Sequence, residues 1–184
     1  MNQCLSSSFI RYWPIDVLLI IFSAFLMAPA GCNSAPETMR NDLEKMETAG
    51  INIKGQPFEV WLATTPQEQQ LGLMQVTEDE LSCLPDETGQ TVPGIQQGML
   101  FIFPVERILS FWMHNTIIPL DIAYIRQDGI IVNISTMAPL ETRTYPSVEP
   151  AMFALEVKAG LFAQLGIGPG DRVEFPDSVL KPRP

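Results

Sequence analysis

The stretch LDIAYIRQDGIIVNIS, residues 120–135, decides the fold class. It contains two runs rich in β-branched and aliphatic residues, Leu120 to Ile125 and Ile130 to Ser135, joined through Gln127-Asp128-Gly129. Asp-Gly between two such runs is a strong hairpin signal, because the glycine tolerates the positive φ angle that tight hairpin turns require. The stretch therefore predicts two antiparallel strands.

Further short strands are predicted on both sides of this hairpin. Apolar runs of strand length lie at Gly98 to Phe103 and Ile108 to Met113. Alternation with period two predicts strands at Phe58 to Leu62 and Phe153 to Val157, and a turn at Gly168 to Asp171 leads into a last strand, Arg172 to Phe175. Two short helices are expected at Thr65 to Gly72, which starts with a capping-box pattern, and at Ala159 to Leu165. Because no alternating βαβ rhythm is visible, we expect a mainly β fold (β-rich α+β): a compact antiparallel sheet or barrel-like domain with two short helices.

The N-terminus has the anatomy of a signal peptide. Val17 to Met27 is an uninterrupted apolar run of eleven residues, preceded by Arg11 and followed by small residues up to Cys32. The run is well short of the ~20 residues that span a bilayer as a helix, so export is expected rather than a permanent transmembrane anchor. Ala30-Gly31-Cys32 resembles the lipobox of bacterial lipoproteins, which implies acylation of Cys32, whereas Pro29 departs from the aliphatic residue usual there and Ala28-Pro29-Ala30 also fits an ordinary cleavage site.

These signals divide the chain into four parts. We predict a signal peptide at 1–31, a polar tether at 32–50, a single β-rich domain at 51–176 and a C-terminal tail at 177–184. The expected location is the cell envelope, as a membrane-anchored lipoprotein, or the periplasm or exterior if Cys32 carries no lipid. The segment Thr77 to Gln97 reads as a surface loop with at most one turn of helix.

Composition excludes some partners. The chain has 11 Lys and Arg against 21 Asp and Glu, a net charge of −10, and its basic residues are scattered singly. A nucleic acid partner is therefore not expected, since phosphate backbones are held by clustered Lys and Arg. No CxxC or Cys/His spacing appears among the three cysteines, so we expect no metal site, and nothing in the sequence calls for a cofactor.

A set of short motifs occurs in an order that resembles one protein family. The motifs are Gly72-Leu73-Met74, Gly98-Met99-Leu100-Phe101, Phe111-Trp112-Met113-His114-Asn115-Thr116, Pro119-Leu120-Asp121-Ile122 and Leu155-Glu156-Val157-Lys158-Ala159-Gly160. From about Ile53 to Phe175 the chain is similar to the family named domain of unknown function 192. The resemblance implies a small, mainly β fold, frequent export and no settled activity. His114 stands where Lys is common in the family, and the loop at 77–97 is longer than usual.

The candidate site begins at the aromatic motif. Trp112 is followed at once by His114, Asn115 and Thr116, so aromatic surface lies beside hydrogen-bonding side chains, as in many ligand clefts. The alternative is that Trp112 belongs to the core and that the Asn and Thr finish a turn. Asp121 and Glu156 each interrupt an apolar strand and are expected to share one face, either solvent or the floor of the cleft.

Three functions fit these residues. The first is a non-catalytic binding module of the envelope that recognises a small polar ligand, a glycan or a protein partner through Trp112, His114, Asn115, Thr116, Asp121 and Glu156. The second is a carbohydrate-active hydrolase that uses Asp121 and Glu156 as a carboxylate pair. The third is a structural or accessory lipoprotein without a ligand site. Because no nucleophile elbow, metalloprotease helix or phosphate-binding loop is present, we favour the non-catalytic binding module.

Overall fold

The computed structural model describes residues 39–82 and 94–180. The predicted signal peptide, Cys32 and the start of the tether lie outside the described residues, as do Cys83, the middle of the long loop and residues 181–184. Within the described ranges, no helix has the length and apolar character needed to cross a bilayer.

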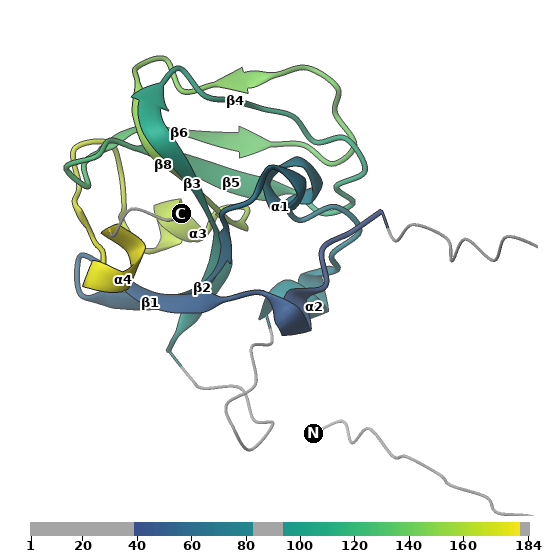
Figure 1. The fold of residues 1–184 in the computed structure, drawn as a ribbon, viewed down its shortest axis with the longest axis horizontal. Coiled ribbons are helices and arrows are strands. Elements are labelled where there is room, and N and C mark those ends of the chain that lie inside the picture. The colour runs from purple at the N-terminus through teal and green to yellow at the C-terminus, as the bar shows by residue number, and fades with distance from the viewer. Residues whose placement is uncertain (1–38, 83–93, 181–184) are drawn as a thin grey trace, which may run out of the picture. The chain divides into compact units, whose positions relative to one another are not determined.

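The fold is built on one curled sheet of seven strands that forms a half-barrel (Figure 1). The strand order is β6-β5-β8-β3-β2-β1-β9. The strands are β1 (Thr48–Ile53), β2 (Gln56–Ala63), β3 (Gln96–Arg107), β5 (Leu120–Ile125), β6 (Ile131–Met137), β8 (Ala151–Lys158) and β9 (Val173–Glu174). A separate two-stranded ribbon consists of β4 (Ser110–Phe111) and β7 (Tyr145–Pro146). The expected mainly β class is confirmed.

The predicted hairpin is present as the antiparallel pair of β5 and β6. β5 and β6 pair antiparallel from Leu120 and Met137 down to the turn, where Gly129 has a φ of 85°. All other pairs of the large sheet are antiparallel except β2 and β3, which run parallel and are joined by a crossover. A bridge between Ile130 and Arg172 connects the β6 side of the sheet to the β9 side, which helps to hold the sheet in its curled form.

The described residues contain four short α-helices, of which two were predicted. The predicted ones are α1 (Pro66–Leu71) and α3 (Leu161–Gln164), and the others are α2 (Glu78–Ser82) and α4 (Asp177–Leu180), with a 3-10 turn η1 (Leu43–Lys45). The capping box of α1 forms as expected: the Thr65 hydroxyl accepts from the Glu68 N–H, and the Glu68 carboxylate accepts from the Thr65 N–H.

Two boundaries differ from the sequence prediction. The folded domain begins before residue 51, because β1 starts at Thr48 and the buried Asn41 amide donates to the carbonyls of Glu68 and Gly72 at the end of α1. The Glu68 carbonyl also accepts from the Gly72 N–H, so the Asn41 amide joins the capped end of α1 and the last part of the expected tether packs on the domain. The predicted strand ends at Phe103, before Pro104, whereas β3 continues to Arg107. Proline has no N–H to donate, and it is tolerated here because the regular pairing of β3 with β8 is interrupted between Ile102 and Arg107.

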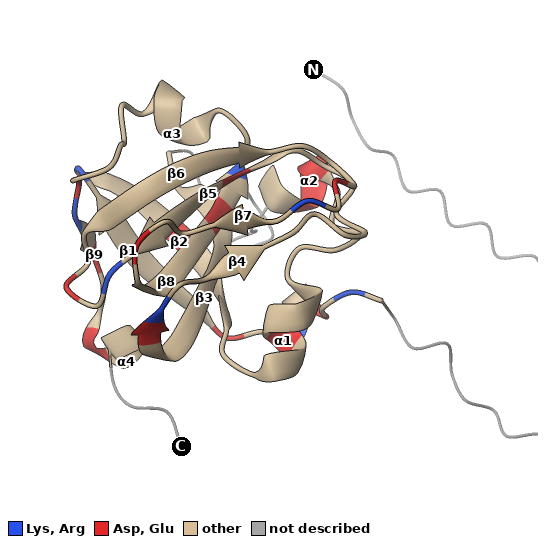
Figure 2. Cartoon of the chain, turned by 90° about the horizontal axis from the view of Figure 1, so that it is seen from above, with Lys and Arg blue, Asp and Glu red and all other residues tan. Residues whose placement is uncertain are grey.

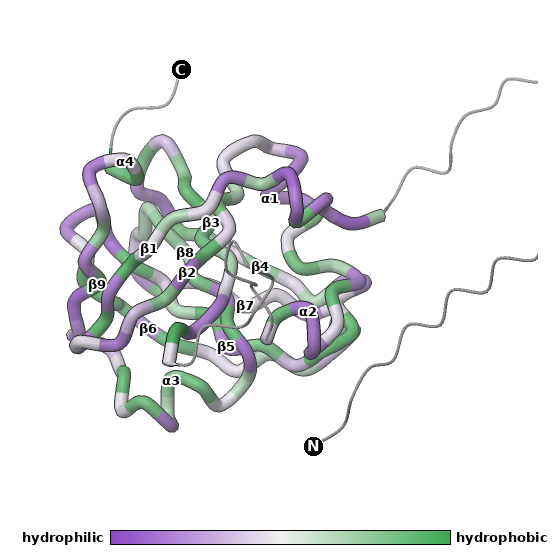
Figure 3. The backbone as a smooth tube through the Cα atoms, turned by 90° about the horizontal axis from the view of Figure 1, so that it is seen from below, coloured by the Kyte–Doolittle hydropathy of each residue, from purple (hydrophilic) through white to green (hydrophobic). Residues whose placement is uncertain are grey.

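Apolar side chains bury both faces of the sheet. On one face, β2, β3, β5 and β8 contribute Leu62, Leu100, Ala123 and Leu155, which pack with Phe162 of α3 and Val179 of α4. On the other face Met99, Phe101 and Tyr124 pack with residues of the ribbon and of α2. Apolar positions run along the strands while charged residues lie mostly in loops and at strand ends (Figures 2 and 3). Because an apolar core covers each face of the sheet, a polar side chain within a strand faces one core or the other, according to its position in the strand.

Candidate functional site: the outer face of the β4–β7 ribbon

Trp112 lies on the surface of the domain. Its side chain is 49% exposed and stacks on the imidazole of His114, with ring centroids 4.8 Å apart and planes 19° from parallel. The interpretation of Trp112 as a core residue is therefore wrong. His114, the only histidine of the chain, is half-buried and supports the indole ring from one side.

Backbone hydrogen bonds hold the turn that carries this stack. Met113 N–H donates to the Glu141 carbonyl at 3.0 Å, and Leu140 N–H donates to the Thr116 carbonyl at 2.9 Å. Asn115 adopts a left-handed conformation with a φ of 57°, and its carbonyl accepts from the backbone and side-chain N–H groups of Gln75. Asn115 and the buried Thr116 thus finish a turn through their main chains, as the alternative interpretation of the sequence holds.

Side chains alternate between the two faces of the ribbon. Leu109, Phe111 and Met113 point inward, and the Phe111 ring meets Phe101 edge-on at a centroid distance of 4.8 Å. Because adjacent residues of a strand face opposite sides, Ile108, Ser110 and Trp112 point outward. Tyr145 of β7 and Ser147 just after it are both buried and alternate in the same way with exposed residues on either side.

Exposed apolar side chains concentrate in the segments that flank the ribbon. Eight large hydrophobic residues are exposed in the described chain, and six of them fall in the segments 105–117 and 140–148, namely Val105, Ile108, Trp112, Ile117, Leu140 and Val148. Ile108 and Val148 lie next to each other across the ribbon, since their neighbours Leu109 and Ser147 exchange hydrogen bonds. We call these six residues the ribbon face. Clustered apolar surface of this kind marks interaction sites on soluble domains.

The carboxylate of Asp121 is held in place by two hydrogen bonds within the fold. Asp121 is 2% exposed, and its carboxylate accepts from the Thr136 hydroxyl at 2.7 Å and from the Gly160 N–H at 2.8 Å. Gly160 has a φ of 81° and begins α3, so Asp121 fixes the turn between β8 and that helix. This contact explains why Pro-Leu-Asp and the later Ala-Gly occur together among the sequence motifs.

Glu156 lies on the other side of the sheet from Asp121. Asp121 pairs directly with Val157, and Glu156 pairs directly with Ile122, so adjacent positions of β8 separate the two carboxyl groups onto opposite faces. The prediction that the two acids share a face is wrong, and with it the carboxylate pair of a glycoside hydrolase loses its geometry. Glu156 and Asp121 also lie away from the outward side chains of the ribbon.

The Glu156 carboxyl is buried among apolar groups. It is 4% exposed, near Gly72 and close enough to Tyr124 to interact electrostatically, and it forms no hydrogen bond with any residue of the described ranges. Burial raises the pKa of Glu156 to about 8, because the charged form loses its hydration in the interior. At neutral pH the group is therefore mainly a neutral acid.

The part of the chain that the structure describes offers no metal centre, since no three His, Cys, Asp or Glu side chains come together there. Of the six predicted site residues, the structure brings together Trp112, His114, Asn115 and Thr116 in one turn. It separates Asp121 and Glu156 from them and from each other. Ile108, Leu140 and Val148 are exposed and were not among the predicted site residues, although period-two alternation along residues 108–113 indicates one exposed face.

Comparison with known proteins identifies the family. The model of DUF192, described as "Uncharacterized ACR", matches residues 49–175. The chain belongs to this family. That range begins within β1 and ends just after β9, and Cys32 lies outside it.

Two solved structures resemble this DUF192 chain. A protein of unknown function from Novosphingobium aromaticivorans is 33% identical, with 74% of this chain and 91% of that chain covered at a TM-score of 0.61. A protein from Sinorhizobium meliloti, named only provisionally as a transcription regulator, is 31% identical, with 71% and 95% covered at a TM-score of 0.59. Among curated proteins, nothing matches. These similarities agree on the fold and assign no activity to the family.

Proposed function

We propose that this DUF192 chain is a non-catalytic binding module that contacts a protein partner through the ribbon face. The observation that carries the proposal is the half-exposed Trp112 ring, which stacks on His114 on a hydrogen-bonded turn, in a part of the chain where several aliphatic side chains are also exposed. Tryptophan is enriched at the energetic centres of protein interfaces because it buries a large rigid surface at little entropic cost.

Aliphatic surroundings favour a protein over a glycan or a small polar ligand. Sites for polar ligands place a few convergent hydrogen-bonding groups around an aromatic wall. Here the exposed neighbours on the ribbon face are Ile108, Ile117, Leu140 and Val148. Flanking charges come from Arg143, which lies over the Tyr145 ring and pairs with Glu141, and from Arg107, which lies over Phe103. An apolar centre with a charged rim is the usual anatomy of a protein interface.

Replacement of Trp112 tests the proposal. In envelope extracts of the natural host, the wild-type chain is expected to migrate on a native gel as part of a larger complex, and Trp112→Ala is expected to migrate alone. A truncated interface tryptophan costs about 2 kcal/mol or more, which is roughly a thirtyfold loss of affinity. Because Trp112 is half-exposed, the thermal midpoint of the variant should stay close to that of the wild type.

Met39→Ala provides the matched control, since Met39 is similarly exposed but lies outside the ribbon face. It should leave the complex intact. A Trp112→Ala chain that still migrates in the complex, or a wild-type chain whose mobility changes only on addition of oligosaccharide, would contradict a protein contact at the ribbon face.

We further propose that the domain is held at the envelope membrane by a lipid on Cys32. The Ala-Gly-Cys sequence after the apolar run supports this, and several acyl chains together give lasting attachment at ~0.8 kcal/mol per buried methylene. The wild-type chain should incorporate labelled palmitate and sediment with membranes, and Cys32→Ser should do neither. Cys83→Ser serves as the control and should keep the label. An unlabelled wild-type chain that is cut after Ala30 would indicate ordinary secretion instead.

A further inference from the structure

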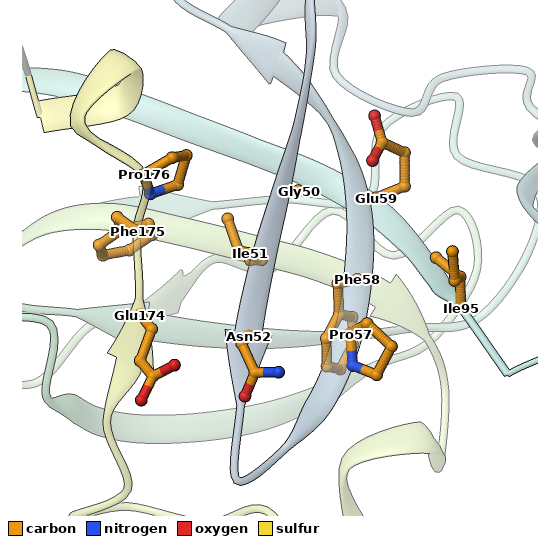
Figure 4. Close-up of a pocket in the computed structure, with 10 residues that line it drawn as sticks. All are labelled: Gly50, Ile51, Asn52, Pro57, Phe58, Glu59, Ile95, Glu174, Phe175 and Pro176. Carbon is orange, nitrogen blue, oxygen red and sulfur yellow. The ribbon is translucent and has the colours of Figure 1, made fainter.

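A groove with a volume of 460 Å³ lies far along the sheet from the ribbon, where β1 and the segment after β9 diverge (Figure 4). β9 pairs with β1 only at Asn52 and Ile53, and beyond Glu174 the chain turns away toward α4. The walls are apolar and are formed by Ile51, Pro57, Phe58, Ile95, Phe175 and Pro176. A feature of this size fits a short peptide segment better than a large surface.

The edge of β1 beside this groove has backbone N–H and C=O groups that point away from β2. Leu62 N–H donates to the Glu47 carbonyl at 2.8 Å. With the β1–β2 register, this bond shows which residues of β1 are hydrogen-bonded to β2 and which are not. In an antiparallel pair every second residue directs its N–H and C=O away from the partner strand. Those residues are Thr48, Gly50 and Asn52, of which only Asn52 meets β9. Within residues 39–82 and 94–180 no further strand pairs with Thr48 or Gly50, so this part of β1 is an edge to which an added strand could bond.

Charge in the groove has one sign. The ten lining residues include two acids, Glu59 and Glu174, and no Lys or Arg. A side chain built at Gly50 would meet the Glu59 carboxylate at 3.7 Å, so that carboxylate lies over this edge of β1. Within residues 39–82 and 94–180, neither acid forms a salt bridge. Unpaired carboxylates above an apolar groove select for a positively charged occupant.

We propose that this groove binds an extended, positively charged segment of a protein partner, which adds to the edge of β1 at Thr48 and Gly50 and places its basic side chains on Glu59 and Glu174. Main-chain hydrogen bonds supply the attachment in such strand addition, and the side chains supply the selectivity. This site is separate from the ribbon face and does not depend on it.

A defined peptide tests the proposal on the full chain in detergent solution. The probe is a fluorescent hexapeptide of alternating Lys and Val with blocked ends, and its anisotropy reports binding. The double variant Glu59→Gln/Glu174→Gln should weaken binding about tenfold or more, and raising the salt from about 0.02 M to about 0.5 M should weaken wild-type binding similarly. Glu44→Gln/Glu149→Gln removes the same charge outside the groove and should leave binding unchanged, as should Trp112→Ala.

Three further outcomes decide the matter. The same peptide with alternate amides N-methylated should lose binding, because it cannot complete the ladder; unchanged binding would overturn strand addition. Equal weakening by both double variants would indicate general attraction to an acidic protein and would overturn the groove as the site. Tighter binding to a chain that ends at Leu180 would mean that the chain's own tail, which contains Lys181 and Arg183, is the occupant instead of a partner.

Discussion

Gly98→Ala is expected to destabilise the domain by about 3 kcal/mol or more, enough to unfold much of a marginally stable protein. A Cβ at position 98 would lie 2.4 Å from the backbone carbonyl oxygen of Glu156 and 2.9 Å from a methyl of Val157. The clash is with backbone in the neighbouring strand β8, so no side-chain rotation relieves it. Strand glycines commonly mark such close approaches.

The measurement is the urea unfolding midpoint, compared with that of Gly168→Ala. Gly168 has open space around its Cβ position and no positive φ, so the control should change the free energy of unfolding by less than about 1 kcal/mol. If the two variants unfold at the same urea concentration, β3 and β8 do not approach as closely as described.

Glu156 should make the domain less stable as the pH rises from about 5 to about 8. Its pKa is about 8 in the folded state against an ordinary value of 4.5, so between these values the folded chain holds a proton that the unfolded chain has released. Stability falls with pH wherever the folded state binds more protons, at up to 1.36 kcal/mol per pH unit for one group, which amounts to about 3 kcal/mol over this window.

Glu156→Gln removes the titration while it keeps the size of the side chain. The variant should have a nearly flat pH dependence over the same window and should exceed the wild type in unfolding free energy at about pH 8, by on the order of 2 kcal/mol. Glu80 cannot mask this effect, because its pKa is lowered to about 2 by hydrogen bonds with Arg40 and Thr77, and it therefore acts at lower pH. Parallel curves for the two proteins would mean that Glu156 is ionised in the fold.

Local patterns predicted much of the sheet. Asp128-Gly129 between two β-rich runs gave the β5–β6 hairpin, and Thr65 with Glu68 gave the start of α1, because both signals depend on residues close in sequence. The parallel β2–β3 pair and the strand order depend on contacts between distant segments, on which local periodicity carries no information.

The prediction that Asp121 and Glu156 share a face was wrong for the same reason, because it depends on how two distant strands pair. Alternation correctly placed each acid opposite to its own apolar neighbours, but which faces coincide depends on the register between β5 and β8. The register pairs Asp121 with Val157, and a shift by one residue would have brought the two acids together. Sequence alone fixes the alternation within a strand, whereas the register follows from the packing of both cores.

In the segment that carries Trp112, the sequence pattern predicts more burial than the structure shows. The run from Ile108 to Met113 is apolar apart from Ser110 and predicts a buried strand, yet only Leu109, Phe111 and Met113 reach the core. The other face of the ribbon has no described element over it and keeps Ile108 and Trp112 exposed. Large apolar side chains on an uncovered face are typical of an interaction surface.

Photocrosslinking from the ribbon face tests the central claim most directly. Val148, which is 73% exposed beside Ile108, is replaced by a photoreactive phenylalanine analogue in the full chain, expressed in its natural host. We predict one discrete protein adduct from this position, its loss when Trp112→Ala is added, and none from the same probe at Met39. No adduct at position 148, or an adduct that persists without the Trp112 side chain, would contradict a partner seated on the ribbon.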